Sequence, residues 1–160
     1  MKSQKGLTLL STIVLVLVIA FITFGVVYFV RLQTTKEGLE DMKTDLLQVQ
    51  AKVKKISSDY ILEKKDDVLV GTKISDIKEE PIIQEFLNQN SINIEEKGKK
   101  YYALNQQNLN ELELTQIKLE DNSYYIVEYT EAKVYYTKGY ELNGNSYYDI
   151  DNIEELKIEE

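Results

Sequence analysis

The sequence predicts an α+β fold, in which a long N-terminal α-helix, with a membrane half and an exported half, packs on a small antiparallel β-sheet. Three observations predict this fold. Residues 7–30 form an uncharged apolar run, residues 39–60 repeat apolar side chains at helical spacing, and residues 124–136 hold two tyrosine-rich segments with a hairpin-length gap between them. A helix with one apolar stripe and a sheet with one apolar face bury each other as two layers.

The first element is the run of 24 residues at positions 7–30, of which 19 are apolar. A helix of this length would extend about 36 Å, which is enough to cross a hydrocarbon core of about 30 Å. The run is longer than the apolar region of a secretory signal peptide, and no small-residue cleavage pattern follows it at Tyr28–Arg31. Lys2 and Lys5 slightly favour a cytoplasmic N-terminus. We therefore expect a single-pass protein of the cell membrane with an exported C-terminal domain.

Residues 31–60 are predicted to continue the helix as an amphipathic stalk that ends near residues 57–61. Its apolar side chains recur at alternating intervals of three and four residues, as in a coiled coil. They form what we call the heptad seam: Leu39, Met42, Leu46, Val49, Val53, Ile56 and Tyr60. The pattern leaves two alternatives open, because the seam could pack on the sheet of its own domain or pair with a helix of another protein as a parallel coiled coil.

Residues 61–160 have the length of one small α+β domain. In its first half the local patterns predict a helix that contains Pro81 and is capped by Ser75 or Asp76, with a break after it at residues 88–90. A strand at 91–95, a turn at 97–100 and a strand at 101–104 are expected to follow. Asn105 is then expected to cap a short helix.

The second half of the domain carries the stronger β-sheet pattern. Tyr124–Tyr129 and Lys133–Tyr136 are predicted to form a hairpin around residues 130–132. A second turn at residues 143–145 leads to a strand at 146–150, and a final amphipathic turn is expected at residues 153–156.

Composition excludes several classes of function. The chain has no cysteine and no histidine, which excludes disulfides, thiolate or imidazole metal sites, and Cys–His or Ser–His nucleophiles. Residues 32–160 carry a net charge of −11, which disfavours binding to nucleic acid. We expect no cofactor, no metal and no enzymatic activity.

Three polar or aromatic clusters have a structural explanation that we favour over a functional one. Ten of the twelve tyrosines follow residue 100 and could stack a sugar or a partner chain, but strand tyrosines also build a core. Asp149–Asn152 with Glu154 and Glu155 could offer oxygen ligands, yet they lack the pattern of a calcium loop, and capping of a helix by Asp151 explains them. The pairs Glu79–Glu80 and Glu95–Glu96 are expected to be solvated surface charges.

The most specific motif lies at the start of the apolar run, where the sequence reads Lys5-Gly6-Leu7-Thr8-Leu9-Leu10-Ser11. Here the chain resembles type IV prepilins and the pseudopilins of type II secretion and DNA-uptake machines. Those proteins begin with a short basic leader that ends in Gly, followed by an apolar residue, Thr-Leu and a long apolar helix. The tyrosine-rich C-terminal segments also resemble the sheets of prepilin-like proteins from Gram-positive anaerobes.

The resemblance implies processing by a prepilin peptidase after Gly6, with N-methylation of the new terminal amine at Leu7. Thr8, Leu9, Leu10 and Ser11 would then take part in filament assembly. The implied partners are the prepilin peptidase, other pilin or pseudopilin subunits, and an assembly platform in the inner membrane. After assembly, the chain would lie in a filament at the cell surface.

Two departures from the family pattern define the kind of subunit. Ser11 stands where the family usually has a Glu that meets the terminal amine of a neighbour, and the usual helix-kinking Pro is missing, since Pro81 is the only proline. Some minor pseudopilins also lack that Glu, so the resemblance implies a minor subunit.

The predicted organisation is a leader at residues 1–6, a membrane or filament-core helix at 7–30, a heptad stalk at 31–60 and an exported domain at 61–160. The alternative function is an uncleaved single-pass scaffold, whose seam forms a coiled coil with another envelope or cell-division protein. A third hypothesis is a membrane-tethered module that binds a cell-wall ligand.

Overall fold

The computed structural model describes residues 4–142 and 144–154, with side chains at 13–14, 16–27, 37–142 and 144–153. The chain divides into a first unit, residues 1–38, and a second unit, residues 39–160. Helix α1, Gln4–Glu63, begins in the first unit and ends in the second. Within the residues that the structure describes, no helix combines the length and the apolar character needed to cross a membrane.

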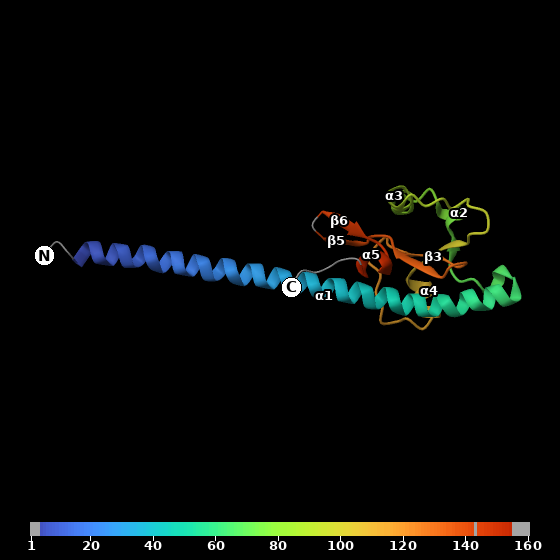
Figure 1. The fold of residues 1–160 in the computed structure, drawn as a ribbon, viewed down its shortest axis with the longest axis horizontal. Coiled ribbons are helices and arrows are strands. Elements are labelled where there is room, and N and C mark those ends of the chain that lie inside the picture. The colour runs from blue at the N-terminus through green and yellow to red at the C-terminus, as the bar shows by residue number, and fades with distance from the viewer. Residues whose placement is uncertain (1–3, 143, 155–160) are drawn as a thin grey trace. The chain divides into compact units, whose positions relative to one another are not determined.

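The second unit has an α+β fold with a small antiparallel sheet (Figure 1). Its four strands are β1 (Thr72–Lys73), β2 (Tyr101–Leu104), β3 (Tyr125–Glu128) and β4 (Lys133–Tyr136), which lie in that order. Every neighbouring pair is antiparallel. The β3–β4 hairpin pairs Glu128 with Lys133 and Tyr125 with Tyr136, which confirms the predicted hairpin around residues 130–132.

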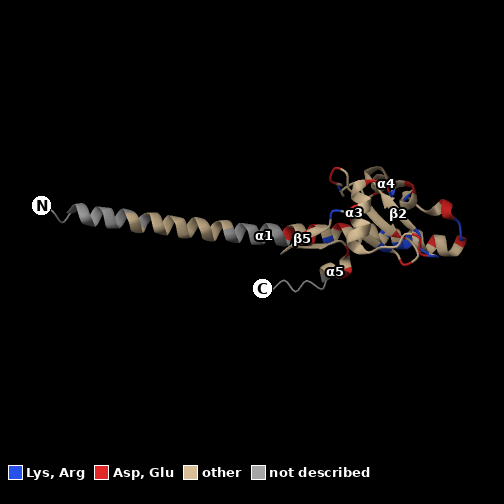
Figure 2. Cartoon of the chain, turned by 90° about the horizontal axis from the view of Figure 1, so that it is seen from above, with Lys and Arg blue, Asp and Glu red and all other residues tan. Residues whose placement is uncertain are grey.

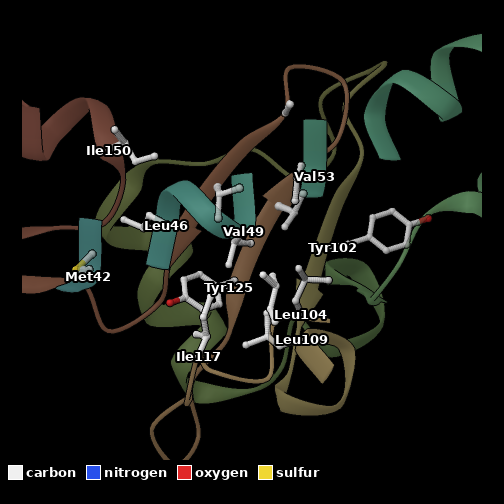
Figure 3. Close-up of a cluster of buried hydrophobic side chains, with 14 of the residues drawn as sticks. Met42, Leu46, Val49, Val53, Tyr102, Leu104, Leu109, Ile117, Tyr125 and Ile150 are labelled. Carbon is white, nitrogen blue, oxygen red and sulfur yellow. The ribbon is translucent and has the colours of Figure 1, made fainter. Parts of the chain in front are cut away.

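One face of this sheet packs on the part of α1 that begins at Leu39. The seam residues Leu39, Met42, Leu46, Val49 and Val53 are buried, and Ile56 is partly buried against them. They share one core with Tyr102, Leu104, Tyr125 and Val127 from the sheet, and Figure 3 shows side chains from α1 and the strands meeting there. The heptad seam therefore packs on the sheet of its own domain, as in the first of the two alternatives.

The opposite face of the sheet is covered by two short helices, α2 (Ile74–Ile77) and α3 (Pro81–Asn90). Ile74, Ile83 and Phe86 are buried there against Ala103 and Ile126. Successive strand residues point to opposite faces. Tyr102 therefore lies in the core on the α1 side of the sheet, and Tyr101 packs against the core on the opposite side. Figure 1 shows α1 on one side of β3, with α2 and α3 on the other.

Three predictions between residues 75 and 95 are wrong. The predicted single helix is split at Glu80, whose extended backbone (ψ 130°) precedes Pro81, the first residue of α3. Helix α3 also continues through the predicted break at 88–90 and ends at Ser91, which adopts a left-handed conformation (φ 52°). Residues 91–95 form turns instead of a strand, although Ile92 and Ile94 still pack on the second core.

The remaining elements follow the predictions more closely. Helix α4, Gln106–Glu111, is capped by Asn105 in a reciprocal capping box with Asn108. Strands β5 (Tyr140–Leu142) and β6 (Asn145–Tyr147) form a separate hairpin around the predicted second turn. Helix α5, Ile150–Glu154, replaces the end of the predicted strand at 146–150 and begins before the predicted turn at 153–156. A 3₁₀ turn, Asp66–Val68, precedes β1.

Candidate functional site

The processing and assembly residues predicted from the N-terminal motif have no described side chains. Gly6, Leu7 and the segment Thr8–Ser11 fall within the backbone range of α1, while the first three residues of the leader lie outside the described residues altogether. Their roles stay predictions.

The next part of the first unit presents apolar side chains around the whole helix. Every described side chain from Ile13 to Val27 is exposed, with Phe21 and Phe24 each 75% exposed. The hydroxyl of Thr23 donates to the carbonyl of Ile19 at 2.8 Å, so this polar group is satisfied inside the helix. A helix that is apolar on all sides fits only lipid or a core made of other apolar helices.

Polar contacts fix α1 to the sheet in the second unit. Buried Ser57 donates through its hydroxyl to the carbonyl of Tyr129 at 2.5 Å, and Gln50 donates to the carbonyl of Ala132 at 3.4 Å. Both acceptors flank the β3–β4 turn. The helix is therefore docked on the sheet by directional bonds as well as by the apolar seam.

The turn that α1 contacts is organised by one buried carboxylate. Glu128 is 2% exposed and accepts hydrogen bonds from the backbone N–H groups of Lys100 (3.0 Å), Thr130 (2.9 Å) and Glu131 (2.8 Å), and from the Thr130 hydroxyl. The ammonium of Lys99 lies 3.8 Å away. Burial alone would raise the pKa of this carboxyl, but the hydrogen bonds outweigh burial and hold the pKa below its usual value.

Glu128 is a structural group, because its oxygens are already occupied by donors. A carboxylate with a lowered pKa and four hydrogen bonds makes a poor general base. The sequence analysis missed this residue. The available signal was an acidic side chain at the end of an apolar strand, directly before a hairpin turn, where backbone N–H groups gather.

The tyrosines after residue 100 build the core, as the favoured explanation predicts. None of them is exposed, and Tyr102, Tyr125, Tyr129 and Tyr148 are buried. Phe86 packs edge-on against both Tyr135 and Tyr148, with ring centroids 5.7 Å apart in each pair. Burial raises the pKa of Tyr135 to about 12.

The acidic clusters also have structural roles. Asp149, and not the predicted Asp151, accepts a hydrogen bond from the backbone N–H of Asn152 at 2.8 Å at the start of α5, because that helix begins at Ile150, three residues before the expected turn. Glu80 accepts a hydrogen bond from the hydroxyl of Tyr124 at 2.8 Å, which raises the pKa of this tyrosine. No group of acidic residues in the described part of the chain is arranged to hold a metal ion.

Two of the hollows on the second unit have several lysines in their linings. One of about 140 Å³ is lined by Lys73, Lys99 and Lys100, but Lys99 forms an ion pair with Glu131, and Lys100 lies 2.9 Å from Asp66. The other, of about 500 Å³, lies along α1 beside Lys52 and Lys55. Neither brings together groups that could carry out a reaction.

The candidate functional surface is therefore the exposed apolar segment of α1 in the first unit. In the second unit the heptad seam of α1 is buried against the sheet of the same domain. No protein-family model matches the sequence, and neither a curated protein nor a solved structure matches it.

Proposed function

We propose that the protein is a minor pilin or pseudopilin that a prepilin peptidase cleaves after Gly6 and that is assembled through its apolar helix into a filament of the type IV pilus kind. The observation that carries the proposal is the motif Lys5-Gly6-Leu7-Thr8-Leu9 at the entry of the 24-residue apolar run.

The different burial of the two parts of α1 supports this proposal. A subunit of a helical filament needs an apolar segment free for its neighbours and a domain that α1 holds firmly. The described side chains of residues 13–27 are exposed and apolar, whereas the seam from Leu39 to Val53 is buried in the core of the second unit. The long helix of the proposed subunit would join these two functions.

Ser11 is the reason to assign a minor subunit. A serine cannot provide the negative charge with which the family's usual Glu meets the terminal amine of the preceding subunit. Such a chain would depend on neighbours of another kind for part of its assembly, and would work with an assembly platform in the membrane.

The alternative scaffold is less well supported. A coiled coil through the seam would require Leu46, Val49 and Val53, each 0% exposed, to leave the core that they share with the sheet. Exposing such side chains costs about 1.5–3 kcal/mol each. Pairing of the seam with a partner helix would therefore unfold the domain that α1 carries.

Intact-mass analysis of the chain from its native membrane tests the proposal. We expect a mature chain that begins at Leu7 with a methylated amine. Gly6→Val should abolish this processing, while the matched variant Gly25→Val, inside the apolar run where nothing lies within 4 Å of an added Cβ, should leave it intact. A wild-type chain that retains Met1 or Lys2 beside an active prepilin peptidase would contradict the proposal.

A further inference from the structure

The segment that joins α1 to β1 is exposed and carries two adjacent lysines. Every residue from Ile61 to Asp67 is exposed, and this is the longest exposed run in the described part of the second unit. Lys64 and Lys65 lie in its middle, between the end of α1 and the 3₁₀ turn Asp66–Val68. Neither lysine forms an ion pair among the described residues. Their ammonium groups can therefore enter an acidic binding pocket of another protein.

The backbone of this segment can open at little cost. Lys64 has a left-handed conformation (φ 54°) that residues other than glycine rarely adopt, so extending it relieves strain. Lys65 is already extended (φ −118°, ψ 133°). Opening the 3₁₀ turn would break the bonds of Asp66 to the N–H of Leu69 (3.1 Å) and to the ammonium of Lys100 (2.9 Å). No buried side chain and no strand would have to move.

Proteases bind extended segments that reach several residues to each side of the cut bond, and the other lysines are held more firmly. Opening the turn around Lys97 would pull the first residue of β2 out of the sheet. Opening the turn around Lys78 would break the hydrogen bond between Glu80 and the hydroxyl of Tyr124. The remaining lysines of the described second unit lie in a helix or strand, in an ion pair, or beside a buried residue: Lys43, Lys52, Lys54, Lys55, Lys73, Lys99, Lys100, Lys118, Lys133 and Lys138.

We infer that the bond after Lys64 or after Lys65 is the site at which a protease of trypsin-like specificity hydrolyses the folded chain, and that the domain stays bound to α1 afterwards. Water adds across the peptide bond, which leaves a carboxylate on the lysine and an amine on the residue that follows. Exposed loops of this kind are the segments that proteases nick in folded proteins.

The contacts that hold α1 lie before this bond, and their partners lie after it. The heptad seam from Leu39 to Val53 shares its core with strands β2 and β3. The hydroxyl of Ser57 is bonded to the carbonyl of Tyr129, and the ammonium of Lys52 lies 3.0 Å from the carboxylate of Glu113. Hydrolysis therefore turns one chain into two chains that share one core, and neither chain can bury its own apolar face alone.

The inference goes beyond the proposed function, because it needs only that the second unit meets a protease. In the proposed filament, a nicked subunit would keep its domain on its helix, and only unfolding would release the domain. After unfolding, the two chains would have to find each other again, so refolding of the nicked protein would depend on its concentration.

Limited digestion of the full chain in detergent with trypsin, followed by intact-mass analysis over time, tests the site. Among cuts between residues 39 and 154, we expect the first to follow Lys64 or Lys65. Lys64→Gln and Lys65→Gln in one chain should abolish this cut. The matched variant, Lys54→Gln with Lys55→Gln, changes an exposed pair inside α1 and should leave the cut unchanged. A first cut at another lysine in that range would overturn the assignment.

Size-exclusion chromatography of the nicked sample tests the retention of the domain. The fragment that begins at Lys65 or Asp66 lacks the apolar run, so its co-elution with the detergent-bound fragment reports docking on α1. We expect co-elution in buffer and separation in urea. Separation without urea would refute the retention.

The seam can be tested in the same assay. Leu46→Ala should lower the urea concentration at which the two fragments separate, because it weakens the core that they share, whereas Leu47→Ala should not. Equal separation of both variants and the wild type would show that contacts other than the seam hold the fragments together, and would overturn the proposed mode of retention.

Discussion

Two stretches assigned to the same helix, residues 13–27 and 39–57, use apolar side chains in opposite ways. In the first stretch they surround the helix, and every described side chain is exposed. In the second most of them, with Leu47 the main exception, lie in the seam and are buried against the sheet. Charged residues fill many of the positions between them, and Figure 2 colours such residues red and blue. The arrangement of apolar residues around a helix, more than their presence, therefore decides whether the helix packs on its own domain or on another surface.

The largest expected effect tests whether the heptad seam forms the core between α1 and the sheet. Leu46→Ala removes a side chain that is 0% exposed and should lower the free energy of unfolding by about 2–5 kcal/mol, because it leaves a cavity between α1 and the sheet. The adjacent Leu47→Ala, at a position 46% exposed, is the matched control and should change it by less than about 0.5 kcal/mol. Urea unfolding of the detergent-solubilised chain, followed by near-UV circular dichroism of the tyrosines, measures both. Equal effects would mean that the seam is not the core.

The next effect tests the exposed stretch. Phe21→Arg places a charge in the apolar segment and should cost about 3 kcal/mol of membrane insertion, which lowers the share of the chain that stays in the membrane after an alkaline wash. Leu62→Arg, at an exposed position of the second unit, should not change that share. Full retention of the Phe21 variant would argue against a lipid environment for this segment.

A third effect tests how the turn beside α1 is held. Glu128→Gln removes the charge that three backbone N–H groups and the Thr130 hydroxyl stabilise, and should cost about 1.5–3 kcal/mol at neutral pH. Since the pKa of folded Glu128 lies below its unfolded value of about 4.3, the carboxylate stabilises the fold above that pH, and this contribution is lost as the pH falls through the folded pKa.

Unfolding free energies of the wild type and the Glu128→Gln variant should therefore converge in acid. Glu141→Gln, at an exposed position of β5, serves as the control and should follow the wild type at every pH. A difference between wild type and the Glu128 variant that persists unchanged at low pH would show that lost packing, and not lost charge, causes it.

The smallest effect compares two neighbouring serines on α1. Ser57→Ala removes the buried hydrogen bond to the Tyr129 carbonyl and should cost about 1 kcal/mol in urea unfolding. Ser58→Ala removes only an exposed bond to the carbonyl of Lys54 in the same helix and should be close to neutral. A neutral Ser57 variant would mean that this hydrogen bond adds nothing measurable to the attachment of α1.

Elements with a strong local pattern could be predicted from the sequence. The β3–β4 hairpin and the Asn105 cap depend on residues close together in the chain, and both are confirmed. Residues 91–95 alternate like a strand because Ile92 and Ile94 both cover the second core, yet no strand in the part of the chain that the structure describes pairs with them. Alternation reports which side chains face inward, and does not by itself report strand pairing.

The site was harder to predict than the fold. The hydrogen bonds of Glu128 join Lys100 to a turn 28 or more residues away, so no local sequence pattern predicts them. The choice between the two alternatives for the seam also required the sheet, because a heptad pattern is equally suited to a partner helix and to a β-sheet face. The roles of the N-terminal motif, Lys5 to Ser11, stay predictions, because the structure describes no side chains there.

The short outer strand β1 has a consequence for how the domain avoids unwanted association. At Thr72–Lys73 the sheet ends in only two paired residues, one of them a lysine. On the other edge, the backbone N–H of Tyr136 in β4 is already bonded to the carbonyl of Tyr148 at 2.8 Å. Sheet edges that are this short or already occupied offer little backbone for a foreign strand to extend, which protects a crowded tyrosine-rich domain from aggregating strand by strand.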